Sequence, residues 1–246
     1  GAEADQKINE GKSLLNDLKK FGLMGSLSPH AFYSSSQQLL NQLKTESKIY
    51  SIHFLESKHE QIFLERHTGP FEDFYKSIDI SPADVIKTGE DFLNSITKTF
   101  PSGKNILLVH NTFTENKQIS YLSDCFPNRL YWIACPNSNL YIENHLPDLH
   151  LFFEKKMKLA LGTDSLSSTR KLSILEEMKT ITEKFPEIPF EEIINWACLN
   201  GARALNMQDK LGSLEIGKKP GINLIENFDF QKKCLTKNSK IRVIAS

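Results

Sequence analysis

Residues that can bind a metal or move a proton recur at the ends of short apolar runs in this sequence. They are His53, Glu56, His110 and Asp164. Neutral imidazole and carboxylate are ordinary ligands of zinc, and also of iron and manganese. A catalytic metal keeps one position open for water and lowers the pKa of that water. If the fold brings these four residues together, the sequence predicts a divalent metal centre that activates water.

Each of these residues, taken alone, has an ordinary structural explanation. A histidine at the end of a strand is more often capped or solvated than bound to metal. Asp164 alone is more typical of a helix N-cap or an Asx turn. We favour the metal site because the pattern recurs at the same end of successive runs. The capping role then passes to Ser165 or Ser167.

The apolar runs alternate with segments of helical periodicity, which is the pattern of parallel βαβ units. The runs are apolar almost throughout, as expected for strands that are buried on both faces. In a parallel barrel all strand C-termini open onto one face, so residues distant in sequence converge there. The expected strands are 23–27, 49–54, 105–110, 130–135 and 158–161; the expected helices are 4–21, 36–43, part of 56–74, 82–99, part of 115–125, 173–185 and 190–204.

The composition narrows the classes of partner. The 246 residues carry 30 basic and 30 acidic side chains, so no positive excess favours nucleic acid or an anionic membrane surface. No apolar run approaches the length of a membrane span. The four cysteines are widely spaced and form no Cys-x-x-Cys pair. We therefore expect a cytoplasmic protein with a small-molecule substrate and without a nucleic-acid or membrane partner.

Six motifs, in order along the chain, resemble the amidohydrolase superfamily. They are SPHAFYSSS, IHFLES, LLVHNT, CPNSNLYI, LGTDSLSS and NGARALNMQDKLGSLEIGKKPGINLI. The nearest branch looks like the chlorohydrolase, guanine deaminase and cytosine-deaminase-like group. The resemblance implies hydrolysis of C–N bonds, and of C–Cl bonds in some members. Its leading form is deamination of a nitrogen heterocycle by metal-activated water.

The resemblance also implies a role for each residue of the metal centre. His53 and His110 match metal-ligand histidines. Asp164 matches an aspartate that contacts the metal and takes a proton from the attacking water. Glu56 matches a glutamate that carries protons to the substrate and the leaving group. The implied cofactor is one divalent metal, zinc in the first place, with iron or manganese as alternatives.

The resemblance implies further residues that contact the substrate. His30 matches a substrate-contacting histidine in the motif around Pro29, and it is not expected to bind the metal. Asn137 and Asn139, with Ser138 between them, match a loop that shapes the substrate pocket.

The sequence departs from the family in one respect, because it contains no His-x-His motif. The family carries that motif on the first barrel strand, and His30 matches the fourth. We therefore expect a partial TIM (β/α)8 barrel of about strands 4–8 in residues 1–208. Short strands near 222–225 and 241–244 then belong to a small β-sandwich in residues 209–246. A full barrel alone needs roughly 250 residues.

This departure leads to expectations about completeness and partners. Open, apolar strand edges favour pairing with another chain, so we expect a homodimer or pairing with a missing N-terminal portion. We expect the chain to be the C-terminal part of a larger protein and inactive, or nearly so, by itself. The alternative is a non-catalytic, amidohydrolase-like binding or scaffold protein. A weaker alternative is a generic parallel α/β protein whose strand-end histidines are incidental.

Overall fold

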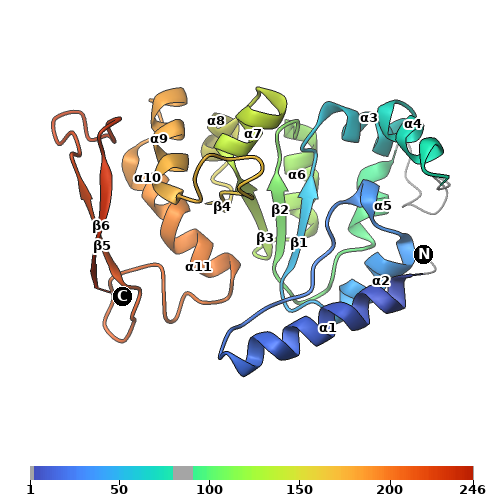
Figure 1. The fold of residues 1–246 in the computed structure, drawn as a ribbon. Helices are drawn as coiled ribbons and strands as arrows, with labels where there is room; N and C mark the ends of the chain where they lie inside the picture. Colours follow the sequence, from blue (N-terminus) through green and yellow to red (C-terminus); the bar gives the residue numbers. More distant parts are fainter. Residues whose placement is uncertain (1–2, 80–90, 246) are drawn as a thin grey trace. The chain divides into compact units, whose positions relative to one another are not determined.

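A computed structural model describes residues 3–79 and 91–245 of the chain (Figure 1). The chain divides into two compact units, Gly1–Leu130 and Tyr131–Ser246. Each unit combines helices with a pair of parallel strands, so the predicted α/β class is confirmed. The predicted division at residue 208 stays a prediction.

The first unit is built around two parallel strands, β1 (Tyr50–Phe54) and β2 (Ile106–His110). In the pairing register, Tyr50 lies opposite Ile106 and Phe54 lies opposite His110. The strands thus end side by side, which sets the positions of the polar residues that follow them. The helices of this unit are α1 (Ala4–Lys20), α2 (Gln37–Glu46), α3 (Lys58–Arg66), α4 (Pro70–Ser77), α5 (Phe92–Thr97) and α6 (Asn116–Cys125), with a 3-10 turn at Phe32–Ser34.

Local sequence signals account for several of these helix boundaries. The Ser36 side chain accepts a hydrogen bond from the backbone N–H of Leu39 at the start of α2. Ser57 does the same for Glu60 at the start of α3. Such caps satisfy N–H groups that the first turn of a helix leaves unpaired. The helix expected over 82–99 is represented by α5, and residues 80–90 of that range lie outside the described residues.

The prediction of a strand over 23–27 is wrong. The segment forms no strand, and the hydroxyl of Ser26 makes hydrogen bonds to the neighbouring backbone instead. The Ser26 Oγ accepts hydrogen bonds from the N–H groups of Lys48 and Ile49 and donates to the carbonyl of Ile49. Only further along does a backbone bridge form, between Ala31 and His53. Side-chain hydroxyls can replace the backbone hydrogen bonds of a β-sheet in this way, because they bond to the same N–H and C=O groups.

The second unit contains a parallel pair, β3 (Leu130–Ala134) and β4 (Leu159–Leu161), in which Trp132 lies opposite Leu159. All five residues of β3 are buried, as its uninterrupted apolar sequence predicts. The helices are α7 (Pro136–Glu143), α8 (Leu149–Glu154), α9 (Ile174–Lys184), α10 (Phe190–Asn195) and α11 (Gly201–Ala204).

The helix predicted over 190–204 is interrupted by a π-helical segment, Trp196–Asn200, between α10 and α11. The buried Asn200 donates a side-chain hydrogen bond to the carbonyl of Leu159 at the start of β4. A π segment inserts a residue into the helical spacing. Here the altered spacing accompanies a side-chain contact between the helix and the strand.

The predicted β-structure near the C-terminus is an antiparallel hairpin of β5 (Ile222–Glu226) and β6 (Lys240–Ala245) (Figure 1). Every residue of β6 is exposed. Among the described residues, no helix combines the length and apolarity required to cross a membrane.

Candidate metal and catalytic site

His53 and His110 meet at the ends of the two parallel strands of the first unit. Their ring centroids lie 4.7 Å apart, with the planes nearly perpendicular. His110 is fully buried, whereas the side chain of His53 is 27% exposed. His110 adopts a left-handed backbone conformation with φ of 77°. Such a conformation costs free energy in a residue with a side chain, and it is concentrated at functional sites.

Glu56 reaches both histidines from the turn that follows β1. Leu55 takes a left-handed conformation with φ of 47°, which ends the alternation of the strand. The Glu56 Oε1 atom lies 3.5 Å from Nε2 of His110, and its Oε2 atom lies 3.9 Å from Nδ1 of His53. The turn therefore brings together side chains that a straight strand would send to opposite faces.

These three residues fit a divalent metal. Each of His53, Glu56 and His110 offers one potential ligand atom, and these three atoms lie within 4.8 Å of one another. Ligands of a zinc ion lie about 2 Å from it, and hence roughly 3 to 4 Å from one another. Two nitrogens and one carboxylate oxygen also match the donor types that zinc prefers. The sequence prediction assigned the carboxylate position to Asp164, which belongs to the second unit.

His30 lies beside this cluster. Its ring centroid is 4.7 Å from that of His53, and its carbonyl accepts the backbone N–H of His53 at 2.9 Å. The Nδ1 atom of His30 lies 2.7 Å from the hydroxyl of Ser34. The Ser34 contact helps to orient the ring, and the residue is exposed.

Glu60 is a buried carboxyl group behind the cluster that sequence reasoning missed. Its Oε2 atom accepts the backbone N–H of Glu56 at 2.9 Å, and the residue is fully buried. Burial raises the pKa of Glu60 to about 8, and the charge of Glu56 adds to the increase. The signal was available in the sequence, because Ser57 and Glu60 form the Ser-x-x-Glu pattern of a capping box.

Asp164 is held by two serines in the second unit. The hydroxyl of Ser138 donates to Asp164 Oδ2 at 2.7 Å, and the hydroxyl of Ser168 donates to the same oxygen. Asp164 takes a left-handed conformation with φ of 57°. Both serine hydroxyls thus orient the same carboxylate oxygen of Asp164, Oδ2.

The expected capping role of Ser165 or Ser167 is wrong. The next helix, α9, begins ten residues after Asp164, at Ile174, with Ser173 as its N-cap residue. The hydroxyls of Ser165 and Ser167 instead contact each other at 2.5 Å. The segment between β4 and α9 contains a turn at residues 166–168 and no helix, so no helix start is present there to be capped.

Asn137 and Asn139 lie in the first turn of α7. The side-chain oxygen of Asn137 accepts the hydroxyl of Thr180 at 2.6 Å, and its backbone N–H donates to Glu177 at 2.8 Å. Asn139 is 1% exposed. Glu177 is fully buried and was also missed; burial raises its pKa to about 7. No local pattern could have indicated it, because 40 residues separate it from Asn137.

A pocket of about 400 Å3 in the second unit adjoins these residues. Asn137 and Ser168 line it, and Ser168 is a hydrogen-bond partner of Asp164. Its rim includes two cationic side chains, Arg170 and Lys171. A small ligand in this pocket would therefore contact residues that touch the candidate catalytic aspartate.

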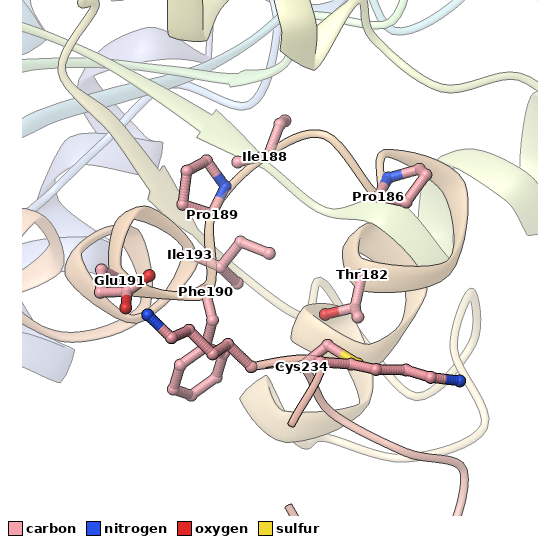
Figure 2. A pocket seen from close by; sticks show the side chains of 10 residues that line it. Thr182, Pro186, Ile188, Pro189, Phe190, Glu191, Ile193 and Cys234 are labelled. Atoms are coloured by element: carbon pink, nitrogen blue, oxygen red, sulfur yellow. The ribbon is translucent and has the colours of Figure 1, made fainter. Parts of the chain in front are cut away.

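A larger pocket of about 540 Å3 lies elsewhere in the second unit, between the end of α9, the start of α10 and residues 232–234 (Figure 2). Its lining is mostly apolar around Pro189, Phe190 and Ile193, with Thr182 and Cys234 beside them. It contains none of the site residues predicted from the sequence. Size alone therefore does not identify the functional pocket in this unit.

The amidohydrolase family model matches residues 2–245, which is nearly the whole chain. The chain belongs to the amidohydrolase family. The resemblance inferred from the six sequence motifs is thereby confirmed, and the chain is not a generic α/β protein outside this family.

Individual relatives agree with this assignment. The chain is 28% identical over 228 residues to an adenosine deaminase of Helicobacter pylori, which covers 89% of this chain and 53% of that protein. It is similar to the crystal structure of Helicobacter pylori aminofutalosine deaminase in complex with methylthio-coformycin, with a TM-score of 0.77, 25% identity and coverage of 93% of this chain and 57% of that one.

A third relative shares the fold. An adenosine deaminase from Xanthomonas campestris with bound zinc matches with a TM-score of 0.66 at 19% identity, over 90% of this chain and 48% of that one. The chain thus spans about half the length of the proteins it matches.

Proposed function

We propose that this chain carries part of the active site of a metal-dependent hydrolase that deaminates a nitrogen heterocycle, with purine nucleosides as the first candidates. The observation that carries the proposal is the cluster of His53, Glu56 and His110 at the ends of adjacent parallel strands. Family membership supports hydrolysis, and relatives named as adenosine and aminofutalosine deaminases support the substrate class. Hydrolysis of C–Cl bonds is a less favoured variant of the same chemistry.

The proposed ligands of the metal are His53, His110 and Asp164, with Glu56 close to both imidazoles. Zinc is the first candidate, supported by the bound zinc of the Xanthomonas campestris relative, and iron and manganese suit the same donors. When bound, the metal lowers the pKa of a water molecule and so supplies a nucleophile at neutral pH.

The protein residues then divide the proton transfers. Asp164 accepts a proton from the attacking water, and its Oδ2 is held for this task by the hydroxyl of Ser138. Glu56 donates a proton to the ring nitrogen of the substrate, takes up the remaining proton of the added hydroxyl as the carbonyl forms, and passes it to the leaving amine. Asp164 then releases its proton to solvent, and solvent reprotonates Glu56. Water adds to the ring carbon, the C–N bond to the amine breaks, and ammonia leaves, so that a carbonyl replaces the amino group.

Substrate contacts are proposed for His30, Asn137 and Asn139. His30 presents an exposed ring beside His53, where it can hydrogen-bond a heterocycle. Asn137 lines the pocket of about 400 Å3. Asn139 is buried in the same helical turn, so it shapes the pocket wall rather than its opening.

The proposed architecture is a partial TIM barrel in residues 1–208 with β-sandwich strands in 209–246. The exposed hairpin of β5 and β6 supports the second part, because an isolated two-stranded hairpin has little stability in water. A second copy, or an N-terminal portion of the protein, is the proposed partner. We propose that the 246 residues alone are inactive or nearly so, and that the protein acts in the cytoplasm.

The second candidate function is a non-catalytic binding or scaffold protein of the same family. It is favoured by the absence of a His-x-His motif from the sequence, which removes two of the family's metal ligands. Metal affinity separates the two candidates, because a degenerate member has no reason to retain a tight site.

The test combines metal analysis with turnover. The chain is purified, stripped with a chelator and titrated with zinc, and the stoichiometry is read by elemental mass spectrometry. We expect one zinc per chain in the wild type and loss of that zinc in the double variant H53A/H110A. Adenosine deamination is then followed by ultraviolet absorbance. Absence of zinc binding would overturn the metal site, and steady turnover by the 246-residue chain would overturn its proposed inactivity.

A further inference from the structure

Helix α7 begins without a cap of its own. Its N-cap residue is Cys135, whose side chain makes no capping hydrogen bond, and Pro136 follows as the first helical residue. The N–H of Asn137 donates instead to Oε2 of Glu177 at 2.8 Å. Glu177 belongs to α9, so one helix supplies the cap of another across 40 residues of sequence.

A second contact from α9 fixes the same residue. Thr180 lies three residues after Glu177 and therefore on the same helical face. Its hydroxyl donates to the side-chain oxygen of Asn137 at 2.6 Å. Helix α9 thus holds both the backbone and the side chain of Asn137, which fixes the direction in which the next residue leaves.

That next residue contacts the candidate catalytic aspartate. Ser138 is fully buried, and its hydroxyl donates to Asp164 Oδ2 at 2.7 Å. Asp164 itself has a left-handed backbone conformation, which persists only where surrounding contacts hold it. An unbroken series of hydrogen bonds and one peptide unit therefore joins Glu177 to Asp164.

We propose that Glu177 is a positioning residue for Asp164: by capping α7 it sets Ser138 and so orients the carboxylate that accepts the proton. The catalytic part of this inference rests on the proposed deaminase function. Glu177 touches neither the substrate pocket nor the metal ligands, and it acts through Asn137 and Ser138.

The free-energy cost of burying the Glu177 carboxyl group argues against a purely structural role. Its Oε1 atom is buried and has no hydrogen-bond partner among the described residues. Burying a carboxyl oxygen without a partner is unfavourable. An apolar residue on α9 with an ordinary cap on α7 would avoid that cost. Violations of this kind are expected where function requires a particular geometry.

The test uses the whole 246-residue chain and a signal from Asp164 itself. The 13Cγ resonance of Asp164 is assigned by its absence in D164N and followed at one fixed pH. The variants are E177A, E177Q, S138A and the double variant E177A/S138A. The matched control is E183A, which removes an exposed glutamate of the same helix that lies 3.8 Å from Lys184.

We expect E177A to shift the Asp164 signal in the same direction as S138A, and the double variant to show no larger shift than S138A alone. E177Q keeps an acceptor for the Asn137 N–H and should restore the wild-type position. The control E183A should leave the signal unchanged. An unchanged Asp164 signal in E177A, or additive shifts in the double variant, would overturn the proposal.

Two further measurements separate this inference from the proposed function. Hydrogen exchange at the Asn137 amide should accelerate in E177A, and equal exchange in wild type and E177A would overturn the capping itself. Where a preparation turns over adenosine, E177A should lower kcat by about 10-fold with KM little changed. If the wild type binds no zinc while the Asp164 signal responds as expected, the metal-dependent deaminase proposal fails and the positioning stands.

Discussion

The two units hold their candidate catalytic carboxylates in different ways. In the first unit, Glu56 follows a strand, and the buried Glu60 that accepts its backbone N–H lies only four residues further on. In the second unit, Asp164 is oriented by Ser138, and the buried Glu177 that caps the adjoining helix comes from a distant part of the chain. Glu60 is close in sequence to the residue it contacts, whereas Glu177 reaches its partner only through tertiary structure. The arrangement around Asp164 therefore depends on the packing of α9 beside α7, and the arrangement around Glu56 needs no such packing.

The comparison also concerns electrostatics. Both buried glutamates accept a backbone N–H through one oxygen, and burial raises the pKa of each, to about 8 for Glu60 and about 7 for Glu177. A carboxyl group with such a pKa is largely or partly protonated at neutral pH. Each unit therefore places a carboxyl of reduced negative charge near its candidate catalytic carboxylate, which limits like-charge repulsion there.

The largest expected effect belongs to the histidine cluster of the first unit. Substitution His110→Ala removes a fully buried imidazole that lies 3.5 Å from Glu56. We expect the zinc dissociation constant to rise by about 100-fold or more, since even indirect supports of metal ligands contribute 10-fold to 100-fold. Competition with a chromophoric chelator measures this constant. His150→Ala, at an exposed histidine near Glu154, is the matched control and should leave zinc affinity unchanged. Equal affinities in the two variants would remove the metal site from the first unit.

The next effect tests the local support through pH. The folded-state pKa of Glu60 is raised from 4.5 to about 8, so its contribution favours folding at low pH and is lost as pH rises through that value. The Glu60→Gln side chain cannot ionise, so its unfolding free energy lacks this loss. Between pH 5 and pH 8 the unfolding free energy of the variant, relative to that of the wild type, should therefore rise by roughly 2 to 4 kcal/mol. Urea unfolding at several pH values measures the difference. Parallel stability curves for the two proteins would show that Glu60 does not titrate in this range.

The sequence predicted the local features of the fold well. Apolar runs identified β1, β2, β3 and β4, and helical periodicity identified α9 to within a residue at each end. These signals succeed because burial on both faces of a strand, or on one face of a helix, constrains residue types directly. The error at 23–27 arose because the Ser26 hydroxyl, rather than the backbone, satisfies the neighbouring N–H groups.

The candidate site was predictable to a different extent in each unit. His53, Glu56 and His110 were found because each lies at a strand end, and the parallel register then brings them together. Glu60 was missed although its Ser-x-x-Glu pattern was present. Glu177 could not have been found, because its partner is set by the packing of α9 beside α7 and not by spacing along the chain.

A smaller effect compares the two serines that hold Asp164. Ser138 and Ser168 donate to the same carboxylate oxygen, but only Ser138 is tied through Asn137 to α9. A hydrogen bond to a charged group contributes about 1.5 to 3 kcal/mol. We expect Ser168→Ala to lower kcat by about 10-fold in a preparation that deaminates adenosine, and its effect should add to that of Glu177→Ala. Non-additive rates for this pair would mean that Ser168, and not Ser138, carries the influence of α9.

The smallest effect separates tertiary support from support within a helix. The Thr180 hydroxyl bonds to Asn137 on α7 at 2.6 Å, and the Glu176 carbonyl of its own helix lies further away, at 3.2 Å. Among the described residues, the Thr182 hydroxyl bonds only to its own helix, at the carbonyl of Met178 and 2.9 Å. Thr180→Val should therefore cost about 1 kcal/mol of unfolding free energy, because it leaves the Asn137 oxygen without that donor. Thr182→Val, the matched control, should cost less than about 0.5 kcal/mol, since a back-bonding hydroxyl contributes little to a helix. Chemical denaturation measures both, and hydrogen exchange at the start of α7 should rise only in Thr180→Val. If the two variants lose the same stability and show the same hydrogen exchange, the hydrogen bond from α9 to Asn137 contributes no more than an ordinary surface contact. The position of Asp164 would then depend on contacts close to it in sequence, as the position of Glu56 does.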